Sequence, residues 1–587
     1  MNIYFSRNKN NNIVKQSSSG GLFSLLANYV IEKSGIVFGA TFNKDFNVEI
    51  TYTDNDISKM LGSKYVQSDV MKTYKECKEF LEKDRLVLYT GTPCQIIGLK
   101  AFLKKDYNNL ITADIICHGS PVKEVWQHYL KSFNKEIESI NFRDKRAGWS
   151  QFRLTIKFKD GTEFSENHNS NSYMKLFLEN KILKESCYNC KCNKNSKSDI
   201  TLGDAWGVYS TIPEFKNDTG VSCVITRTDK GEEIFNNLQN KFVEKTNEAY
   251  LIKNSVGYVH NYTKPNDTEK IKNSILNPKI AMVTIPGHNN VGNTLQAFAL
   301  QQKVKELLPT AEIEIINDFN LTNNKLDFYN KNVKSTSGTF NDSYDMLLVG
   351  SDQIWGASIT RDWKISFEDR FGIRNVKRIF YAPSFGFVNT KYNNQDCARI
   401  KSKLYNEKYV SNREEYGTYM TEKMFGTKCQ TVLDPAFLHS KEFYLQSINE
   451  KNSDKEEGCF CYILDKDNKW ENFIKNVLIQ TKENELNYDK SVESFLHNMN
   501  TAKYILTDSY HGVVFSLIFN KPFVCLRNKN RGNLRFDDLS IKFNIENRFL
   551  ETLDEFDLAV LTKKPNINLD KLLKQSIDFL KRGLYQL

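Results

Sequence analysis

The stretch KIAMVTIPGHNNVGNTLQAFALQQKVKELL, residues 279–308, decides the fold of the second half of this chain. Its first nine residues are a short apolar run that predicts a buried strand, and its last fourteen have the periodicity of a helix. A turn rich in Gly and Asn lies between them. Because nucleotide- and phosphate-binding α/β folds begin with a strand, a turn and a helix in this order, we expect an α/β domain to open at Lys279.

Five further segments repeat this pattern of a short apolar run that ends in polar, Gly or Pro residues. They are YDMLLVGSDQIWG (344–356), RIFYAPSFG (378–386), KCQTVLDPAFL (428–438), AKYILTDSYHG (502–512) and NKPFVCLRN (520–528). Each predicts a strand followed by a loop. Ligands of open α/β sheets bind at the carboxyl ends of the strands, where this pattern places Asp352, Asp434 and His511. Asp434 is equally typical of a strand-end turn, and Trp355 of a core aromatic.

Length and composition limit the remaining choices. The chain has 587 residues, 12 cysteines and a formal net charge of +10. This length exceeds the chain length that a single hydrophobic core usually supports, so two or three domains are expected. We find no secretory signal and no apolar run of about 18 residues, which favours a soluble cytoplasmic protein. Acidic and basic residues are interspersed, so nucleic acid is not an expected partner.

The polar segment YTKPNDTEK, residues 262–270, contains a proline and lacks any apolar period. Such a segment is typical of a boundary between domains. We therefore predict a first domain over residues 1–261, a linker over 262–278 and a second domain over 279–587.

Four cysteines stand in distinctive settings: Cys94 in GTPCQIIGLKAFL, Cys117 in ADIICHGSP, and Cys187 and Cys190 in SCYNC. Ionised sulfurs gathered from two strand ends and a Cys-x-x-Cys loop can hold a soft metal or an iron–sulfur cluster. Structural zinc is the alternative. Zinc modules usually combine two Cys-x-x-Cys pairs, and Cys94 and Cys117 form no such pair, so we favour iron and sulfur.

The first half of the chain resembles the beta subunit family of coenzyme F-420 hydrogenases and dehydrogenases. Ordered motifs carry this resemblance: SSSGG (17–21), SGIVFGATF (34–42), LGSKYVQSD (61–69), LYTGTPCQIIGL (88–99), DIICHGSP (114–121), NFRDKRAGW (141–149), SCYNC (186–190), DITLGDAWG (199–207) and NDTG (217–220). The resemblance implies an α+β flavin domain with a [4Fe–4S] cluster, in which Cys94, Cys117, Cys187 and Cys190 match the cluster positions.

The same resemblance implies a flavin, which we expect to be FAD or FMN rather than the deazaflavin. Gly20 and Gly21 precede a helix-like segment, so backbone N–H groups there are available to a phosphate, with hydroxyls from Ser18 and Ser19. A Gly-Gly pair before a helix is also typical of a simple turn. Lys64 and Tyr65 are expected to face the flavin ring or its phosphates.

Many members of that family carry an N-terminal ferredoxin-like segment with Cys-x-x-Cys-x-x-Cys spacing, and this sequence shows none. We therefore expect an external ferredoxin-like carrier to supply the electrons.

The second half resembles the polysaccharide pyruvyl transferases. The resemblance rests on HNNVGNTLQAFALQ (288–301), DMLLVGSDQIW (345–355), YAPSFG (381–386), VSNREEYG (410–417), VLDPAFL (432–438) and TDSYHGVVFSLIFNKPFV (507–524). It implies a two-lobed, glycosyltransferase-B-like fold of Rossmann type. It also implies transfer of a pyruvyl or enolpyruvyl unit from phosphoenolpyruvate to sugar hydroxyls.

This donor carries a carboxylate and a phosphate, and its enol carbon must gain a proton. His511 is the expected acid or base because imidazole titrates near neutral pH. Arg413 is the first choice for the anionic groups, since a guanidinium binds them bidentately. The expected catalytic set is His511, Arg413 and Asp352. The expected substrate-binding residues are Asn289, Gly292, Asn293, Gln296, Ser351, Ser509, Gly512 and Lys521, with Arg527, Arg531 and Arg535 as further cations.

The sequence thus predicts a cytoplasmic fusion of a flavin and iron–sulfur oxidoreductase module with a pyruvyl transferase module, acting on a cell-surface polysaccharide precursor. The expected acceptor is a nucleotide- or lipid-linked sugar, and a lipid-linked acceptor would bring the protein to a membrane surface. The alternative is that one half is catalytically silent and serves as an electron-relay or sugar-binding module.

Overall fold

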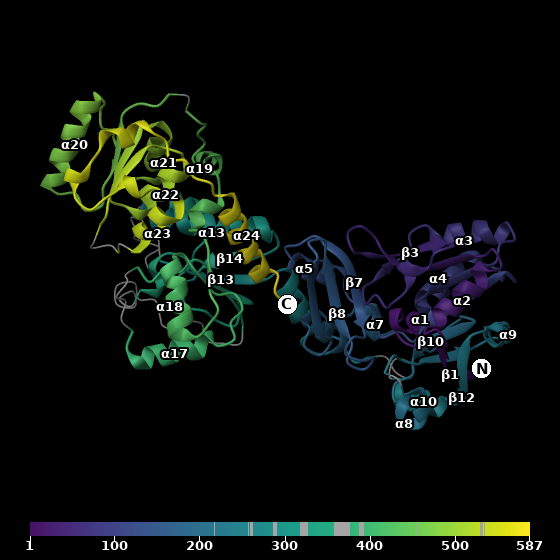
Figure 1. Ribbon diagram of the computed structural model, residues 1–587. Helices are drawn as coiled ribbons and strands as arrows, with labels where there is room; N and C mark the ends of the chain where they lie inside the picture. The colour runs from purple at the N-terminus through teal and green to yellow at the C-terminus, as the bar shows by residue number, and fades with distance from the viewer. Residues whose placement is uncertain are drawn as a thin grey trace. The chain divides into compact units, whose positions relative to one another are not determined.

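The computed structural model describes residues 1–216, 218–255, 258, 262–285, 290–316, 327–356, 376–386, 392–453, 455–528, 532 and 534–587. The chain divides into two compact units, Met1–Ile275 and Leu276–Gln586 (Figure 1). Each unit has its own sheets and its own hydrophobic core.

Unit 1 is built on a nine-stranded mixed sheet. In spatial order its strands are β12 (Lys241–Thr246), β1 (Asn2–Asn8), β11 (Ser222–Thr226), β10 (Ile200–Asp204), β6 (Leu110–Ile115), β5 (Val87–Gly91), β2 (Ile36–Phe42), β3 (Val48–Thr53) and β4 (Ser68–Asp69). The four central strands β10, β6, β5 and β2 are parallel to one another. Their carboxyl ends therefore meet at one edge of the sheet.

Alternate residues of these strands point to opposite faces, and helices cover both. Val37 and Leu88 pack beneath α2, whereas Phe38 and Tyr89 pack beneath α3 and α4. The helices of unit 1 are α1 (Asn11–Gln16), α2 (Leu22–Ile31), α3 (Thr73–Glu82), α4 (Pro93–Leu103), α5 (Lys123–Lys131), α6 (Ser172–Leu178), α7 (Glu185–Tyr188), α8 (Val208–Thr211), α9 (Asp229–Asn237), α10 (Glu248–Asn254) and α12 (Thr268–Leu276).

A second, antiparallel sheet of unit 1 consists of β7 (Ile137–Asp144), β8 (Arg153–Phe158) and β9 (Glu163–Asn167). The segment after α10 also belongs to this unit. Lys264 forms an ion pair with Glu185 at 2.6 Å, and Ile275 of α12 is buried. Much of the stretch that the sequence predicts as a linker is therefore helical and packed.

Unit 2 contains two four-stranded parallel sheets, one in each lobe. The first has the order β14 (Glu312–Ile315), β13 (Lys279–Val283), β15 (Met346–Val349), β16 (Lys377–Phe380), and the second β19 (Cys459–Tyr462), β20 (Tyr504–Thr507), β21 (Phe523–Leu526), β22 (Phe549–Leu550). A short pair, β17 (Ser411–Asn412) and β18 (Gln430–Thr431), is also parallel. The two-lobed Rossmann-type architecture expected from the sequence is confirmed.

The helices of unit 2 are α13 (Val291–Leu307), α14 (Asp327–Asn332), α17 (Asn394–Leu404), α18 (Glu415–Phe425), α19 (Lys441–Ser447), α20 (Asn468–Thr481), α21 (Val492–Thr501), α22 (Tyr510–Ile518), α23 (Leu534–Phe543) and α24 (Asp570–Leu584). Within the described ranges, no helix has the length and apolar character needed to cross a membrane.

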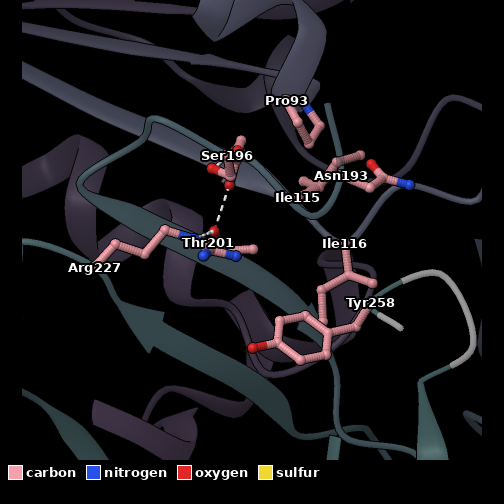
Figure 2. Close-up of a pocket in the computed structure, with 9 residues that line it drawn as sticks. Pro93, Ile115, Ile116, Asn193, Ser196, Thr201, Arg227 and Tyr258 are labelled. Atoms are coloured by element: carbon pink, nitrogen blue, oxygen red, sulfur yellow. Dashed lines mark hydrogen bonds between the residues drawn. The ribbon is translucent and has the colours of Figure 1, made fainter. Parts of the chain in front are cut away.

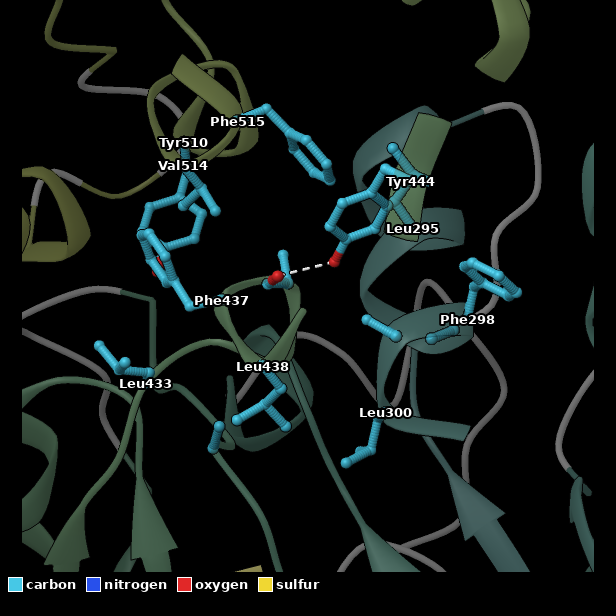
Figure 3. Close-up of a cluster of buried hydrophobic side chains, with 14 of the residues drawn as sticks. Leu295, Phe298, Leu300, Leu433, Phe437, Leu438, Tyr444, Tyr510, Val514 and Phe515 are labelled. Carbon is cyan, nitrogen blue, oxygen red and sulfur yellow. Dashed lines mark hydrogen bonds between the residues drawn. The ribbon is translucent and has the colours of Figure 1, made fainter. Parts of the chain in front are cut away.

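One hydrophobic core runs through both lobes of unit 2. Figure 3 shows Leu295 of α13 and Phe515 of α22 near Tyr444, and Phe437 near Tyr510 and Val514 of α22. The Tyr444 hydroxyl donates a hydrogen bond to a backbone carbonyl beside Phe437, at 2.7 Å. This packing fixes the first turns of α13 and α22, one from each lobe, relative to each other.

Candidate functional site

Three acidic and basic residues that follow strands of unit 2 lie in one buried cluster. Asp352 follows β15, Asp434 follows β18, and His511 lies in the first turn of α22. The Arg413 guanidinium joins the two carboxylates, donating to Asp352 Oδ1 at 3.0 Å and to Asp434 Oδ2 at 2.8 Å. His511 Nε2 lies 3.8 Å from the same Asp434 oxygen. The strand-end rule therefore placed these residues correctly.

Arg413 is fully engaged in contacts within the protein. Its Nε donates to Glu414 Oε1 at 3.0 Å, so all three guanidinium nitrogens bind carboxylates, and the plane lies 4.2 Å from the Tyr510 ring centroid. Only 2% of the residue is exposed. A guanidinium held in this way positions acidic side chains, and little of it remains available for the anionic groups of a substrate.

Arg535 of α23 is a second guanidinium in the cluster. Its Nη1 lies 3.6 Å from Asp352 Oδ1, and its Cζ is 5.2 Å from the Tyr510 ring centroid. Burial lowers the pKa of Arg535, although neighbouring carboxylates oppose this. Among the further cations that the sequence offered, Arg535 is the one that the described structure brings to His511 and Asp352.

The other cations lie elsewhere. Lys521 precedes β21 and therefore sits at the amino end of the sheet, where its Nζ contacts Glu456 at 3.1 Å. His511 follows β20, a parallel strand, so the two residues are at opposite edges. Arg527 pairs with Glu551 at 2.6 Å. Arg531 and Asn289 lie outside the described residues.

His511 is buried beside opposing charges. Burial lowers the pKa of His511; Asp434 and Asp352 raise it, and the two arginines lower it, leaving the pKa below its ordinary value. The ring is therefore neutral at neutral pH. Its Nε2 is buried and has no hydrogen-bond partner among the residues that the structure describes. This nitrogen is the group in the cluster best placed to exchange a proton with a substrate.

Asp352 is ionised at neutral pH. Burial opposes its charge, but Arg413, His511 and Arg535 together hold the pKa of this carboxyl below its usual value. Its backbone has φ 62° and ψ −164°, a conformation that a residue with a side chain seldom adopts. The surrounding contacts hold the carboxylate in this orientation.

The first turns of α13 and α22 are closely fitted around His511. A Cβ on Gly292 would lie 2.3 Å from His511 Nδ1, and a Cβ on Gly512 would lie 2.2 Å from Thr507 Oγ1. Asn290 caps α13 by accepting from Asn293 N at 3.0 Å, and Ser509 caps α22. Gly292 is thus required for close packing where the lobes meet, and Gly512 for close packing of α22 on the end of β20.

Gln296 and Ser351 serve an internal network. Gln296 Nε2 donates to Thr284 Oγ1 and to the Asn293 carbonyl, both at 3.0 Å, and the Ser351 hydroxyl donates to Gln296 Oε1. Both side chains are fully buried. They connect the strand ends of the first lobe.

In unit 1, four cysteines that the sequence selected come to the same edge of the large sheet. Cys94 lies in the first turn of α4 after β5, Cys117 follows β6, Cys187 lies in α7 and Cys190 follows it. Burial raises the pKa of Cys117 to about 12, and the charges of the other three thiols add to this increase. Ionisation of the Cys117 thiol beside these sulfurs would need a compensating positive charge.

Backbone groups near these thiols are oriented toward sulfur. Ser120 N donates to Cys187 Sγ at 3.3 Å, and Cys192 N donates to Cys190 Sγ at 3.4 Å. The donor set of four thiols with N–H donors suits an iron–sulfur cluster. In the described part of the chain, however, no three Cys, His, Asp or Glu side chains are arranged closely enough to hold a metal ion. The sulfurs would have to turn toward one another, and the cluster remains a prediction.

A small cavity with a volume of about 10 Å³ adjoins this region (Figure 2). Pro93 and Ile116, which precede Cys94 and Cys117, line it together with Thr201 and Arg227. The Arg227 Nε donates to Thr201 Oγ1 at 2.7 Å. The cavity has room for about one water molecule, so it does not fit a flavin.

The loop predicted to bind flavin phosphates has structural contacts of its own. A Cβ on Gly20 would lie 2.5 Å from the Ser6 carbonyl oxygen and 2.6 Å from Ser222 N, so this glycine permits close packing of its loop against β1 and β11. Gly21 has φ +78° and starts α2, a backbone that favours glycine. Ser19 Oγ contacts Ser222 Oγ at 2.8 Å.

The neighbouring residues follow the same pattern. Ser63 Oγ donates to Ser18 Oγ at 2.6 Å. Lys64 Nζ donates to carbonyls of its own loop, the nearest being Leu61 O at 3.1 Å, and burial lowers the pKa of Lys64 to about 8. The Tyr65 hydroxyl accepts from Arg143 Nη1 at 3.1 Å. Ser18 and Lys64 are therefore already bonded within the protein.

Three buried donors in this region lack acceptors. Arg143 Nε, Trp149 Nε1 and Asn8 Nδ2 have no hydrogen-bond partner among the described residues. Arg143 also binds Asp204 at 3.2 Å, and Trp149 stacks on Trp206 with centroids 4.6 Å apart. Buried donors without acceptors beside stacked indoles fit the carbonyl-rich edge and flat face of a flavin ring.

Lys145 holds the loops around these donors. Its Nζ donates to the carbonyls of Val14 at 2.9 Å, Ser19 at 3.0 Å and Thr219 at 2.5 Å. Burial lowers the pKa of Lys145 to about 7, and the charge of Arg143 contributes. Helix α1, the loop of Ser19 and the segment at Thr219 are thus tied to one amine.

Comparison with known proteins also divides the chain into two parts, one in each unit. Residues 84–249 match the family model for the C terminus of the coenzyme F420 hydrogenase/dehydrogenase beta subunit, and residues 290–530 match that of polysaccharide pyruvyl transferase. The chain is a fusion that resembles both families. Unit 1 is accordingly called the beta-subunit-like unit below, and unit 2 the transferase-like unit.

Several solved structures are similar to parts of this chain. A chain of the F420-reducing [NiFe] hydrogenase complex from Methanosarcina barkeri has 18% identity, a TM-score of 0.33 and covers 47% of this chain and 92% of its own. UDP-GlcNAc 2-epimerase from Neisseria meningitidis, bound to UDP-GlcNAc, has 9% identity, a TM-score of 0.36 and covers 52% and 99%. The heptosyltransferase WaaC of E. coli with ADP has 10% identity, a TM-score of 0.24 and covers 43% and 88%. A comparison with curated proteins found no match.

Sequence reasoning gave no role to several residues of these sites. Arg143, Lys145 and Asp204 lie in motifs that carried the family resemblance of the beta-subunit-like unit, and that was the available signal. In the transferase-like unit, Glu414 and Tyr510 adjoin Arg413 and His511 in the sequence. Glu414 pairs with its sequence neighbour Arg413, whereas Tyr510 contacts the Arg413 guanidinium from far away along the chain, so its role emerges only when the cluster is assembled.

Proposed function

We propose that the transferase-like unit moves a pyruvyl unit from phosphoenolpyruvate to a nucleotide- or lipid-linked sugar of a cell-surface polysaccharide precursor. The observation that supports this proposal most directly is His511 Nε2, a buried nitrogen without a partner among the described residues, 3.8 Å from Asp434 and next to two guanidinium groups. The match of residues 290–530 to the pyruvyl transferase model gives the reaction class.

The chemistry requires a proton to move from the acceptor to the donor. A sugar hydroxyl oxygen forms a bond to C2 of phosphoenolpyruvate and loses its proton, and the methylene carbon C3 gains a proton to become a methyl group. When a second hydroxyl of the sugar displaces phosphate, a ketal results; when phosphate leaves with loss of a C3 proton, an enolpyruvyl ether results. Either route needs one group that first accepts and then donates a proton.

His511 is suited to start as the acceptor. Its lowered pKa leaves the ring neutral in the free protein, so it can take the proton of the sugar hydroxyl. The imidazolium that forms is then stabilised by Asp434 and Asp352, and it can deliver the proton to C3. Binding of a donor with an anionic carboxylate and an anionic phosphate would raise the pKa of His511 and favour this second step.

Arg413 and Arg535 have different roles toward negative charge in this proposal. Because Arg413 binds three carboxylates, we assign it to holding Asp352 and Asp434 in place around His511. We assign the carboxylate or phosphate of the donor to Arg535. Loss of Arg413 would therefore affect turnover as well as donor binding, which differs from the simple binding role that the sequence indicated.

We further propose that the beta-subunit-like unit is a flavin and [4Fe–4S] oxidoreductase module of the cytoplasm, supplied by an external one-electron carrier. Cys94, Cys117, Cys187 and Cys190 would hold the cluster, and FAD or FMN would lie against Arg143 and the stacked indoles. A flavin exchanges electron pairs and a cluster exchanges single electrons, which is the chemistry that these groups supply when bound. In this proposal Arg143 and the stacked indoles orient the ring and exclude water from it, and Lys145 holds the surrounding loops together.

The test uses the full chain with phosphoenolpyruvate and a panel of nucleotide- and lipid-linked sugars, and it measures phosphate release. We expect release with a suitable acceptor and a loss of about 10²–10⁴ in rate for His511→Ala. His497→Ala is the matched control, because that histidine is exposed and paired with Glu450. Full activity of His511→Ala would reject the catalytic assignment. Absence of release with every acceptor would favour a silent, sugar-binding unit.

A further inference from the structure

The segment that carries Cys187 and Cys190 is strongly basic. Residues 181–197 contain five lysines and one acidic residue, Glu185. Glu185 is already paired with Lys264 at 2.6 Å. The charge of this segment is therefore largely uncompensated by neighbouring acids in its own sequence.

Three of these lysines are exposed without ion pairs. Lys191, Lys194 and Lys197 are exposed, and none has a carboxylate within ion-pair distance in the described ranges. Many exposed lysines elsewhere in this unit are paired, such as Lys159 with Glu136 at 2.8 Å. An exposed, unpaired lysine retains its full charge for a partner.

These lysines lie beside the thiols and next to an exposed apolar side chain. Asn193, between Lys191 and Lys194, donates from Nδ2 to the Cys117 carbonyl at 2.9 Å. Figure 2 shows Asn193 near Ile115 and Pro93, which precede Cys117 and Cys94. Ile115 is 47% exposed, and Cys94 is exposed as well.

We propose that this surface, formed by Cys94, Ile115, Lys191, Lys194 and Lys197 and called the thiol face, docks a small acidic protein that carries one electron. The proposal rests on the oxidoreductase function proposed above. An apolar centre with a charged rim is the anatomy of a transient protein interface. The basic rim would steer an acidic carrier to the point where the thiols come closest to solvent.

The exchange itself transfers no atoms. The reduced carrier loses one electron and the cluster held by the thiols gains it, or the reverse, so the charge balances between the two centres. The exposure of Cys94 allows the carrier to approach closely without opening the fold. A long-lived complex is unnecessary, and weak binding that depends on salt is the expected behaviour.

The experiment measures binding of the full chain to a small acidic [2Fe–2S] ferredoxin by calorimetry, at about 0.02 M and about 0.2 M NaCl. The Debye length falls about threefold between these conditions. The test variant is Lys191→Glu/Lys194→Glu/Lys197→Glu. The matched control is Lys83→Glu/Lys104→Glu/Lys105→Glu, which makes the same charge change where α3 and α4 end, at the opposite edge of the parallel strands.

We expect the test variant to weaken binding about tenfold or more and the control to change it much less. High salt should weaken wild-type binding and have little effect on the test variant. Equal losses in both variants would show that only net charge matters, and the thiol face would be rejected. Tighter binding of a nucleic acid duplex or anionic vesicles than of ferredoxin, with the same lysine dependence, would also reject it.

Iron and sulfide analysis of the same samples separates this proposal from the one on which it rests. Protein with iron, sulfide and flavin that binds the carrier independently of the three lysines would refute the docking surface and leave the oxidoreductase module standing. Protein without iron that still binds through these lysines would refute the cluster instead. Circular dichroism of each variant confirms that the fold is retained.

Discussion

Gly292→Ala is predicted to inactivate the transferase-like unit by displacing His511. The new Cβ would lie 2.3 Å from His511 Nδ1, 2.6 Å from Cγ and 2.8 Å from Cβ. Contacts below 3.0 Å are not tolerated, so the ring must move by about 1 Å. A misplacement of about 1 Å at a reacting group can cost about 10²-fold in rate.

The effect on stability has two opposing parts. Alanine is the better helix former and would contribute up to about 1 kcal/mol to α13. Overpacking against a buried ring costs about 1–3 kcal/mol. In the wild-type background the free energy of unfolding should therefore fall by up to about 3 kcal/mol.

A double-mutant cycle with His511→Gly isolates the contact. All three of the nearest atoms to the new Cβ belong to His511, so the clash disappears when its side chain is removed. Gly292→Ala should then become neutral or stabilising. The assays are phosphate release for activity and urea denaturation for stability. Unfolding in urea is monitored by hydrogen exchange of the amides in α13 and α22. This readout reports on the transferase-like unit alone.

The test compares the change in the free energy of unfolding caused by Gly292→Ala in the wild-type and His511→Gly backgrounds. Full phosphate release by Gly292→Ala, with the same stability change in both backgrounds, would show that Gly292 does not control the position of His511. The steric account of this lobe junction would then be wrong.

Three further predictions concern both units. Anaerobically purified protein should contain about four iron and four sulfide per chain, Cys187→Ser should lose them, and Cys77→Ser should keep them; zinc in place of iron would overturn this. Because burial lowers the pKa of His511, the acid limb of kcat/KM should lie below the ordinary histidine value of about 6.5, and a limb above that value would contradict the proton-acceptor role. Lys145→Met should release the flavin because three carbonyls lose their shared donor, which flavin fluorescence in the filtrate measures, whereas Lys157→Met should retain it.

The sequence by itself determined the α/β architecture of the transferase-like unit and the edge at which its candidate site residues gather. Short apolar runs that end in Gly or polar residues are a local signal, and parallel strands bring their carboxyl ends together wherever the chain goes between them. For this reason the positions of Asp352, Asp434 and His511 along the chain were enough to place them near one another.

Only the tertiary structure decided what each of these residues contacts. Arg413 meets Asp352 and Asp434 from 61 and 21 residues away, so its saturation by carboxylates has no local signal. The need for a glycine at position 20 arises from its close contact with Ser222, which lies 202 residues further along the chain. Charge pairing and close packing depend on which side chains share a buried space, and folding creates that space from distant segments.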